Sequence, residues 1–190
     1  MLFRSVFEQA IETYGAELFL LAHSKNDQAE SVLLGLARGS GTRSLSGMRT
    51  QNGIYVRPFL EIDRKTIEAA CAEAGLEIWS DPHNENLEFK RVKIRRELLP
   101  QLEKDLDPGI IGALARSARI LGEDADALDE WAAMVIAEIG TNDLDVEKLK
   151  ELPKAVRSRV LRSAIYAAGA PAGSISADHL HPVEIGRAHV

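Results

Sequence analysis

The chain has 190 residues, of which 45% are hydrophobic and 27% charged, and its formal net charge at pH 7 is −6. This length and composition suit a globular protein with one domain and part of a second. No apolar run approaches the roughly 20 residues that span a bilayer and no signal-peptide pattern is found, so we expect a cytoplasmic protein without membrane contact.

The first part of the chain alternates between predicted helices and predicted strands. A helix over 6–14 is followed by a buried strand over 17–22, and then by a helix that Asn26 caps and that ends at Gly39. Three further elements follow, a strand, a helix and a strand, over 53–58, 63–74 and 76–79. This alternation predicts an α/β fold with a parallel sheet.

From residue 89 onward the pattern becomes helical, and only Asn142–Val146 resembles a strand. Helices are predicted over 91–102, 108–139, 146–152 and 153–168. Gly122 is expected to interrupt the longest of them. We divide the chain into an α/β domain, a helical region and a tail, over 1–88, 89–184 and 185–190. The tail and Leu2–Ser5 match a translation of sequencing-adapter DNA, so we expect both to be foreign.

The junction after the first predicted strand carries the densest set of reactive side chains. His23 stands at the strand tip, and Asp27, Glu30 and Ser31 share one face of the first two turns of the next helix. Ligands collect at the carboxyl ends of the strands in an open α/β sheet, so this position favours a catalytic or binding role. The alternative stays open that the two acids only complement the positive end of the helix dipole.

A basic segment lies at residues 90–96, where five of the seven residues are Lys or Arg. Arg91 and Arg95 are four positions apart, so on a helix they project together. An acidic protein with a local basic site is compatible with RNA binding. Charge runs also occur on solvated helix faces, and this alternative stays open for the segment.

The sequence offers little for a metal ion. Cys71 is the only cysteine, which excludes an intrachain disulfide and a thiolate cluster, and we expect it to be a small buried hydrophobe. The histidines show no His-Glu-x-x-His spacing, and the pair His179 and His181 lacks a third ligand. We therefore predict no protein-bound metal site.

Ordered blocks of this sequence resemble the tRNA(Ile)-lysidine synthetases, which belong to the PP-loop ATP pyrophosphatase superfamily. The segment His23-Ser24-Lys25-Asn26-Asp27-Gln28-Ala29-Glu30-Ser31 is similar to the family pattern His-x-x-Asp-Asp-Gln-x-Glu-Thr. Further similarity lies at residues 36–48, 57–60, 79–84 and 89–100. The departures inside the first block are mild: Asn26 stands for Asp and Ser31 for Thr.

The family's phosphate-binding signature, Ser-Gly-Gly-x-Asp-Ser, is not found in this sequence. Gly39-Ser40-Gly41 does not replace it, because this segment follows a helix and does not join a strand to a helix. We therefore expect a fragment of a synthetase without its N-terminal PP-loop, and we expect this fragment to be inactive by itself.

The resemblance implies an incomplete Rossmann-like parallel sheet of the PP-loop type over 1–88, followed by an all-α, tRNA-contacting region over 89–184. It implies ATP-dependent ligation of free L-lysine to the first anticodon cytidine of an isoleucine tRNA, through an adenylated intermediate. ATP and Mg²⁺ are the implied cofactors, and a homodimer stays open. A tRNA thiolase, another PP-loop ATPase and a non-catalytic helical RNA-binding module are the alternatives.

The resemblance also implies roles for individual residues. His23, Asp27 and Glu30 would be catalytic, and Arg91 and Arg95 would bind ATP phosphate. The residues expected to bind tRNA are basic: Arg38, Arg43, Lys90, Lys93 and Arg96. We expect Asp81 and Asn84 to cap a turn, and Trp79 to pack inside the protein.

Overall fold

The computed structural model describes residues 2–79, 81–171, 175 and 179–180, and it contains two compact units, Met1–Gly122 and Glu123–Val190. His181 and the tail over 185–190 lie outside the described residues, so what the sequence predicts of them stays a prediction. Within the described ranges, no helix is both long enough and apolar enough to cross a membrane.

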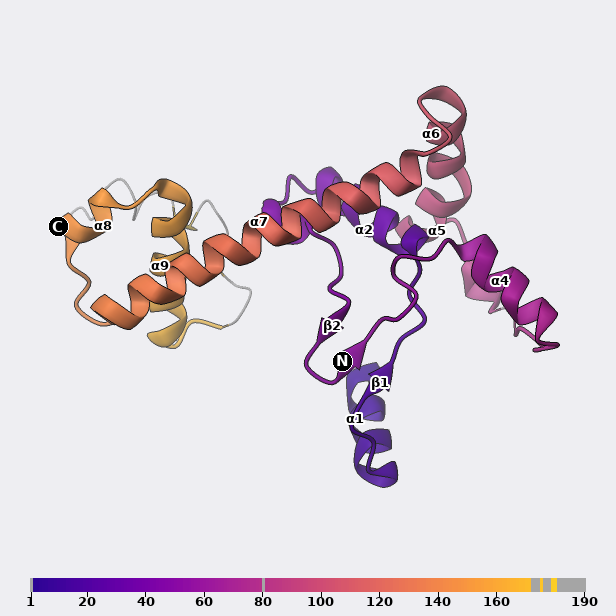
Figure 1. Cartoon of the computed structure of the whole chain (residues 1–190), viewed down its shortest axis with the longest axis horizontal. Coiled ribbons are helices and arrows are strands. Elements are labelled where there is room, and N and C mark those ends of the chain that lie inside the picture. The colour runs from indigo at the N-terminus through magenta and orange to yellow at the C-terminus, as the bar shows by residue number, and fades with distance from the viewer. Residues whose placement is uncertain (1, 80, 172–174, 176–178, 181–190) are drawn as a thin grey trace. The chain divides into compact units, whose positions relative to one another are not determined.

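The first unit contains a small mixed sheet (Figure 1). Its strands β1 (Phe19–Leu20), β2 (Gln51–Asn52) and β3 (Tyr55–Val56) are ordered β1-β3-β2. β1 and β3 are parallel, whereas β2 and β3 are antiparallel and joined by a turn at Gly53, whose φ of 59° suits glycine. The α/β prediction therefore holds, but the prediction of a parallel sheet is wrong for β2 and β3, which form an antiparallel hairpin. The prediction of a buried strand over 17–22 is also wrong, because β1 has two residues and Leu20 is 65% exposed.

Aromatic side chains hold helix α1 (Leu2–Tyr14) against this sheet. The ring of Phe7 lies 4.5 Å from that of Phe19 on β1, and 6.5 Å from that of Tyr55 on β3, measured between centroids. Aromatic pairs at such spacings bury large apolar surfaces and stabilise the contact between helix and sheet. These contacts fix the position of β1, the strand that precedes α2.

The remaining helices of the first unit are short, apart from α2 and the start of α7. They are α2 (Lys25–Ala37), α3 (Thr42–Leu45), α4 (Arg64–Glu73), a 3₁₀ turn η1 (Pro82–Glu85), α5 (Lys90–Lys93), a π-helical segment η2 (Ile94–Leu98), α6 (Leu99–Asp105) and α7 (Ile110–Ile139). Ala29 on α2 is buried against Ile94 and Leu99, and these three residues form the local core. This packing places the basic segment beside the junction that follows β1.

The predicted helix over 91–102 is present as α5, η2 and α6 in succession. Its centre is π-helical, and Pro100 follows at the start of α6. Proline has no backbone N–H and its ring clashes with the carbonyl four residues earlier, so a wider turn before it avoids that clash. Arg95 lies within this π segment.

Three sequence predictions about secondary structure are wrong. Residues 76–79 pair with no strand among the described residues, and Ile78 and Trp79 are 58% and 79% exposed, so Trp79 does not pack inside. Asn142–Val146 forms no strand, because the Asp145 side chain caps α8 there. Gly122 does not interrupt α7, which runs continuously for 30 residues.

The second unit is helical, as the sequence predicts. It contains the end of α7, α8 (Val146–Glu151) and α9 (Lys154–Ala167). Its core is apolar and comprises Ala132, Leu149, Val156, Val160, Leu161 and Leu180. An ion pair of 2.6 Å between Arg159 Nε and Asp129 Oδ1 ties α9 to α7.

The compact units meet at residue 122, whereas the sequence places a boundary near residue 88. The difference arises because η2 and α6 pack on α2 and so belong to the first unit. The predicted functional division at residue 88 stays a prediction.

Candidate active site

The junction between β1 and α2 is shaped by a capping box. Ser24 is the N-cap residue of α2, and both its backbone N–H and its hydroxyl donate to Asp27 Oδ2, at 2.8 and 2.6 Å. The sequence prediction of Asn26 as N-cap is wrong by two residues, since Ser followed three positions later by an acid is itself a capping signal. Asn26 instead accepts a hydrogen bond of 2.9 Å from the backbone N–H of Arg64 at the start of α4.

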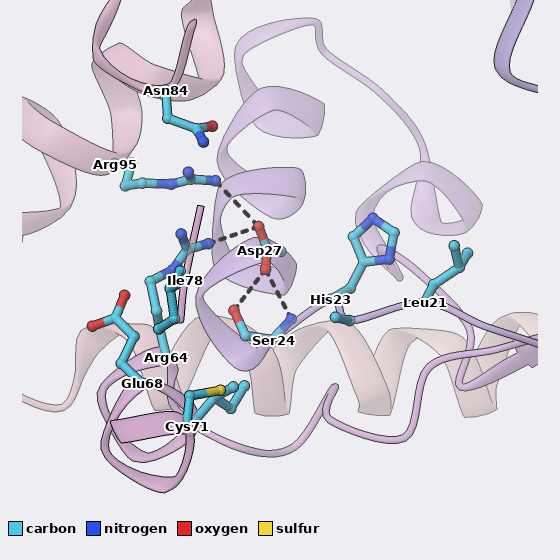
Figure 2. A pocket seen from close by; sticks show the side chains of 12 residues that line it. Leu21, His23, Ser24, Asp27, Arg64, Glu68, Cys71, Ile78, Asn84 and Arg95 are labelled. Atoms are coloured by element: carbon cyan, nitrogen blue, oxygen red, sulfur yellow. Dashed lines mark hydrogen bonds and ion pairs between the residues drawn. The ribbon is translucent and has the colours of Figure 1, made fainter. Parts of the chain in front are cut away.

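Two arginines, Arg64 and Arg95, converge on Asp27 of α2 (Figure 2). Arg95 donates to both oxygens of Glu30, with Nε–Oε1 and Nη2–Oε2 distances of 2.6 and 3.1 Å. Asp27 Oδ1 accepts from Arg95 Nη2 at 3.2 Å and from Arg64 Nη2 at 3.0 Å. Two carboxylates and two guanidinium groups from α2, α4 and η2 therefore form one neutral cluster, here called the carboxylate–arginine cluster.

The surroundings of Asp27 and Arg95 favour the charged forms of these two side chains. Glu30 is fully buried and Asp27 is 8% exposed. Burial would raise the pKa of Asp27, but the hydrogen bonds from Ser24 and the charges of Arg64 and Arg95 outweigh it, so this pKa is lowered. Burial likewise opposes the charge of Arg95, yet the bond to Glu30 and the nearby acids raise its pKa above the ordinary value.

His23 is close to the cluster, but its side chain differs from those of the cluster in charge. Its Nδ1 atom is buried and makes no hydrogen bond with any described residue. Burial lowers the pKa of His23; the charge of Asp27 opposes this effect, and those of Arg57 and Arg91 add to it. The imidazole is therefore neutral at pH 7 and retains one nitrogen lone pair that can accept a proton.

Arg91 contacts the same helix as Arg95. Its Nη2 donates to Ser31 Oγ at 3.1 Å, and Ser31 Oγ donates to the Asp27 backbone carbonyl at 2.9 Å. The predicted common direction of Arg91 and Arg95 is thus present in the structure. So is the predicted common face of Asp27, Glu30 and Ser31 on α2.

A cavity of about 480 Å³ opens beside the cluster (Figure 2). Its walls come from the end of β1, from α2, from α4 and from the segment that precedes α5, and its lining residues are Leu21, Ala22, His23, Ser24, Asp27, Arg64, Ile67, Glu68, Cys71, Ile78, Asn84 and Arg95. Asp81 caps the η1 turn by accepting from the backbone N–H of His83 at 2.9 Å, as predicted. Asn84 faces the cavity, while Cys71 is half-buried on its wall and not in the core, contrary to prediction.

The residues predicted to bind RNA do not line this cavity. Arg38, Lys90, Lys93 and Arg96 are exposed, and Arg43 on α3 is half-buried. Arg96 forms an ion pair of 2.5 Å with Glu85. These side chains lie on the surface of the first unit and are accessible to a large ligand.

The sequence patterns did not reveal Arg64 and Ser24 as parts of the site. Arg64 stands 37 positions from Asp27 in the chain, so no local pattern connects them. Ser24 could have been found from its capping-box spacing to Asp27. Among the described residues, no group of three or more His, Cys, Asp or Glu side chains could hold a metal ion.

Comparison with known proteins places this chain in a family. Residues 3–102 match the family model of the PP-loop domain, and residues 144–184 match that of the TilS substrate binding domain. A tRNA(Ile)-lysidine synthase of Thermobifida fusca is 47% identical over 182 residues, which are 95% of this chain and 56% of the relative. One from Streptomyces coelicolor is 48% identical over 185 residues, 95% of this chain and 53% of the relative.

A tRNA(Ile)-lysidine synthase of Rhodococcus erythropolis is 47% identical over 154 residues, which are 80% of this chain and 47% of the relative. The chain thus spans about half the length of the curated relatives it matches. The PP-loop match alone covers more than half of the chain, and the carboxylate–arginine cluster lies inside it. The chain therefore belongs to the PP-loop domain family, and the relatives it resembles are tRNA(Ile)-lysidine synthases.

Proposed function

We propose that this chain forms part of an enzyme that uses ATP to ligate L-lysine to the first anticodon cytidine of an isoleucine tRNA. The observation that carries the proposal is the convergence of Asp27, Glu30, Arg64 and Arg95 on one cavity at the end of β1. Ligands bind at this position in open α/β sheets. The relatives' names supply the reaction class.

The arginines of the cluster fit an anionic group. Arg95 uses Nε and Nη2 on Glu30 and Asp27, and its Nη1 donates to no described residue. A guanidinium group has five N–H donors, so those on Nη1 are available to a phosphate oxygen. ATP bound there would supply the adenylyl group that activates the cytidine. Mg²⁺ would be carried mainly by ATP phosphates, as is usual for this ion.

The lysine ε-amine must lose a proton before it attacks, because its ordinary pKa is about 10.4. Asp27 is a weak proton acceptor, since its two oxygens accept four hydrogen bonds and its pKa is lowered. Glu30 is fully buried and engaged with Arg95. We therefore assign the role of proton acceptor to the neutral His23. The two carboxylates instead orient the side chains of Arg64 and Arg95.

The tRNA would contact both units. The exposed basic residues of the first unit are Arg38, Lys90, Lys93 and Arg96, and the half-buried Arg43 completes the set predicted from sequence. The match of residues 144–184 to a substrate binding domain supports a second contact in the helical unit. Such contacts would be electrostatic and therefore sensitive to salt. A homodimer stays a prediction.

A graft tests this proposal without depending on the length of the chain. The 182 matched residues of the Thermobifida fusca relative are replaced by those of this chain, and incorporation of labelled lysine into an isoleucine tRNA transcript is measured. We expect incorporation that requires ATP. A graft that folds and binds the tRNA, but incorporates no lysine, would contradict the assigned chemistry and favour a non-catalytic RNA-binding module.

A further inference from the structure

A second cavity in the first unit, of about 710 Å³, shares Arg95 with the first cavity and no other lining residue. Its walls come from the N-terminal ends of α2 and α4, from α6 and from the start of α7. No step of the reaction proposed above uses this cavity. The cavity lies next to Arg95, so it adjoins the candidate active site but is not part of it.

The charged residues that line this cavity are mostly basic. They are Lys25, Lys65, Arg95 and Arg116, against the acids Asp63 and Glu103. Lys25 Nζ is paired with Asp63 Oδ2 at 3.1 Å, and Arg95 is engaged by the carboxylate–arginine cluster. Lys65 and Arg116 are exposed, and neither has an ion pair or hydrogen bond with a described residue. Among the described residues, Lys65 and Arg116 are thus cations of this cavity without a partner. Besides Asp63, which is paired with Lys25, Glu103 is the only acid in the lining.

Backbone N–H groups at the start of α7 also carry a positive partial charge. The N–H of Gly109 donates to Asp107 Oδ1 at 2.6 Å, whereas Ile111 and Gly112 lie in the first helical turn, where N–H groups have no partner within a helix. These donors add to the positive potential that the side chains of Lys65 and Arg116 create.

The lining also indicates which part of an anionic ligand is bound. No aromatic side chain lines the cavity, so it lacks the ring surface on which a nucleobase most often stacks. Lysine and arginine side chains without partners are the groups that usually contact nucleic-acid phosphates. A phosphate of the RNA backbone fits this arrangement better than a free nucleotide, whose base would have no aromatic ring to stack on.

We propose that this cavity is a subsite for a backbone phosphate of the tRNA, held by Lys65 and Arg116. The inference rests on the proposed function, because it takes tRNA as the ligand. The negative charge of Glu103 repels the phosphate and so limits the affinity of the cavity for it. The subsite anchors the tRNA next to Arg95 without contacting the reacting atoms.

The test measures binding of an isoleucine tRNA transcript to the full chain over a range of salt concentrations. We expect Lys65→Ala with Arg116→Ala to weaken binding roughly tenfold near 0.1 M salt, and to lower the slope of log affinity against log salt by about two. Glu103→Gln should strengthen binding. Lys104→Ala, an exposed lysine on α6 outside the cavity, is the matched control.

Two outcomes would overturn the subsite. One is a double variant whose affinity and salt slope equal those of Lys104→Ala while its melting temperature is unchanged. The other is a Glu103→Gln variant that binds tRNA more weakly. Inorganic phosphate is a second probe: amide shifts of Ile111 and Gly112 that phosphate causes, and that the double variant loses, would support the subsite. Failure of the proposed function is seen separately, as a graft that binds tRNA but incorporates no lysine.

Discussion

Arg95 and Glu30, which are 65 positions apart in the chain, form a two-pronged ion pair with N–O distances of 2.6 and 3.1 Å. This pair joins the π segment η2 to α2 and fixes the direction of the Arg95 guanidinium. A planar guanidinium matches a carboxylate in this geometry, and lysine could not reproduce it. The pair is therefore the structural link between the two sequence blocks that carry the candidate site.

Removal of Glu30 should destabilise the first unit. Glu30→Gln removes the negative charge and one of the two acceptor oxygens that face the partly buried Arg95, which we expect to cost about 2–4 kcal/mol in the free energy of unfolding. Urea denaturation measures this change. The matched control is Glu85→Gln, because Glu85 forms an exposed pair with Arg96 and exposed pairs contribute roughly 0–1 kcal/mol. Equal losses for the two variants would contradict a structural role of the buried pair.

Arg64 should hold α4 against α2. Its side chain bonds to Asp27 and its backbone N–H bonds to Asn26. Arg64→Ala removes the first of these bonds, so the cavity wall formed by α4 should open more often. The reaction rate of Cys71 on that wall with a thiol reagent should then rise several-fold. Thr66→Ala, an exposed change on the same helix, should leave this rate unchanged. An unchanged rate in Arg64→Ala would show that α4 is held by other contacts.

Gly47 should tolerate no side chain. Its φ is 65°, and a Cβ there would come within 2.5 Å of Gln28 Oε1. The Gln28 amide accepts from the Met48 backbone N–H at 2.8 Å and donates to its carbonyl at 2.9 Å, so it cannot move away without losing both bonds. We expect Gly47→Ala to cost about 3 kcal/mol.

The matched control for that glycine is Gly53, which has a similar φ of 59°, although a Cβ added there would meet no atom within 4 Å. Gly53→Ala should cost only about 1 kcal/mol, the backbone term alone. Thermal denaturation of both variants separates the backbone term from the contact with Gln28. Equal shifts in melting temperature would contradict the close approach.

His23 should titrate below its ordinary pKa of 6.5, because burial disfavours the imidazolium. The charge of Asp27 opposes this shift and that of Arg91 adds to it, so Asp27→Asn should lower the His23 pKa further and Arg91→Ala should raise it. Between the folded and unfolded pKa values the folded state binds fewer protons. The stability from neutral His23 is therefore complete above pH 6.5 and is lost as the pH falls through the folded pKa.

NMR titration of the imidazole measures these values directly. A His23 pKa above 6.5 in the unmodified chain would contradict both the environment described for this ring and its role as a neutral proton acceptor. A pKa that moves in the same direction in both variants would show that local refolding, and not the two charges, determines it.

Much of this site could be predicted from local spacing. Helical periodicity places Asp27 with Glu30 and Arg91 with Arg95, and the structure shows both pairs on shared faces. The helices of the second unit were found for the same reason, since their apolar residues recur at regular intervals. Sequence similarity added the roles that the two pairs would have in one reaction.

The rest depends on contacts between distant segments. Arg64 could not be assigned, because its role follows from the docking of α4 on α2. Residues 76–79 have an apolar pattern suited to a strand, but no described strand lies beside them to pair with. Cys71 was expected in the core from its residue type, yet its helix faces a cavity. Tertiary context decided each of these cases.

The most direct test of the central claim is lysine incorporation by the graft with the carboxylate–arginine cluster altered. Arg95→Lys keeps the charge but not the two-pronged contact, and we predict a fall of about 100-fold in the single-turnover rate, with tRNA binding retained. Lys104→Ala should incorporate lysine as the unaltered graft does. An Arg95→Lys graft with the full rate would contradict the claim that this cluster forms the reactive centre.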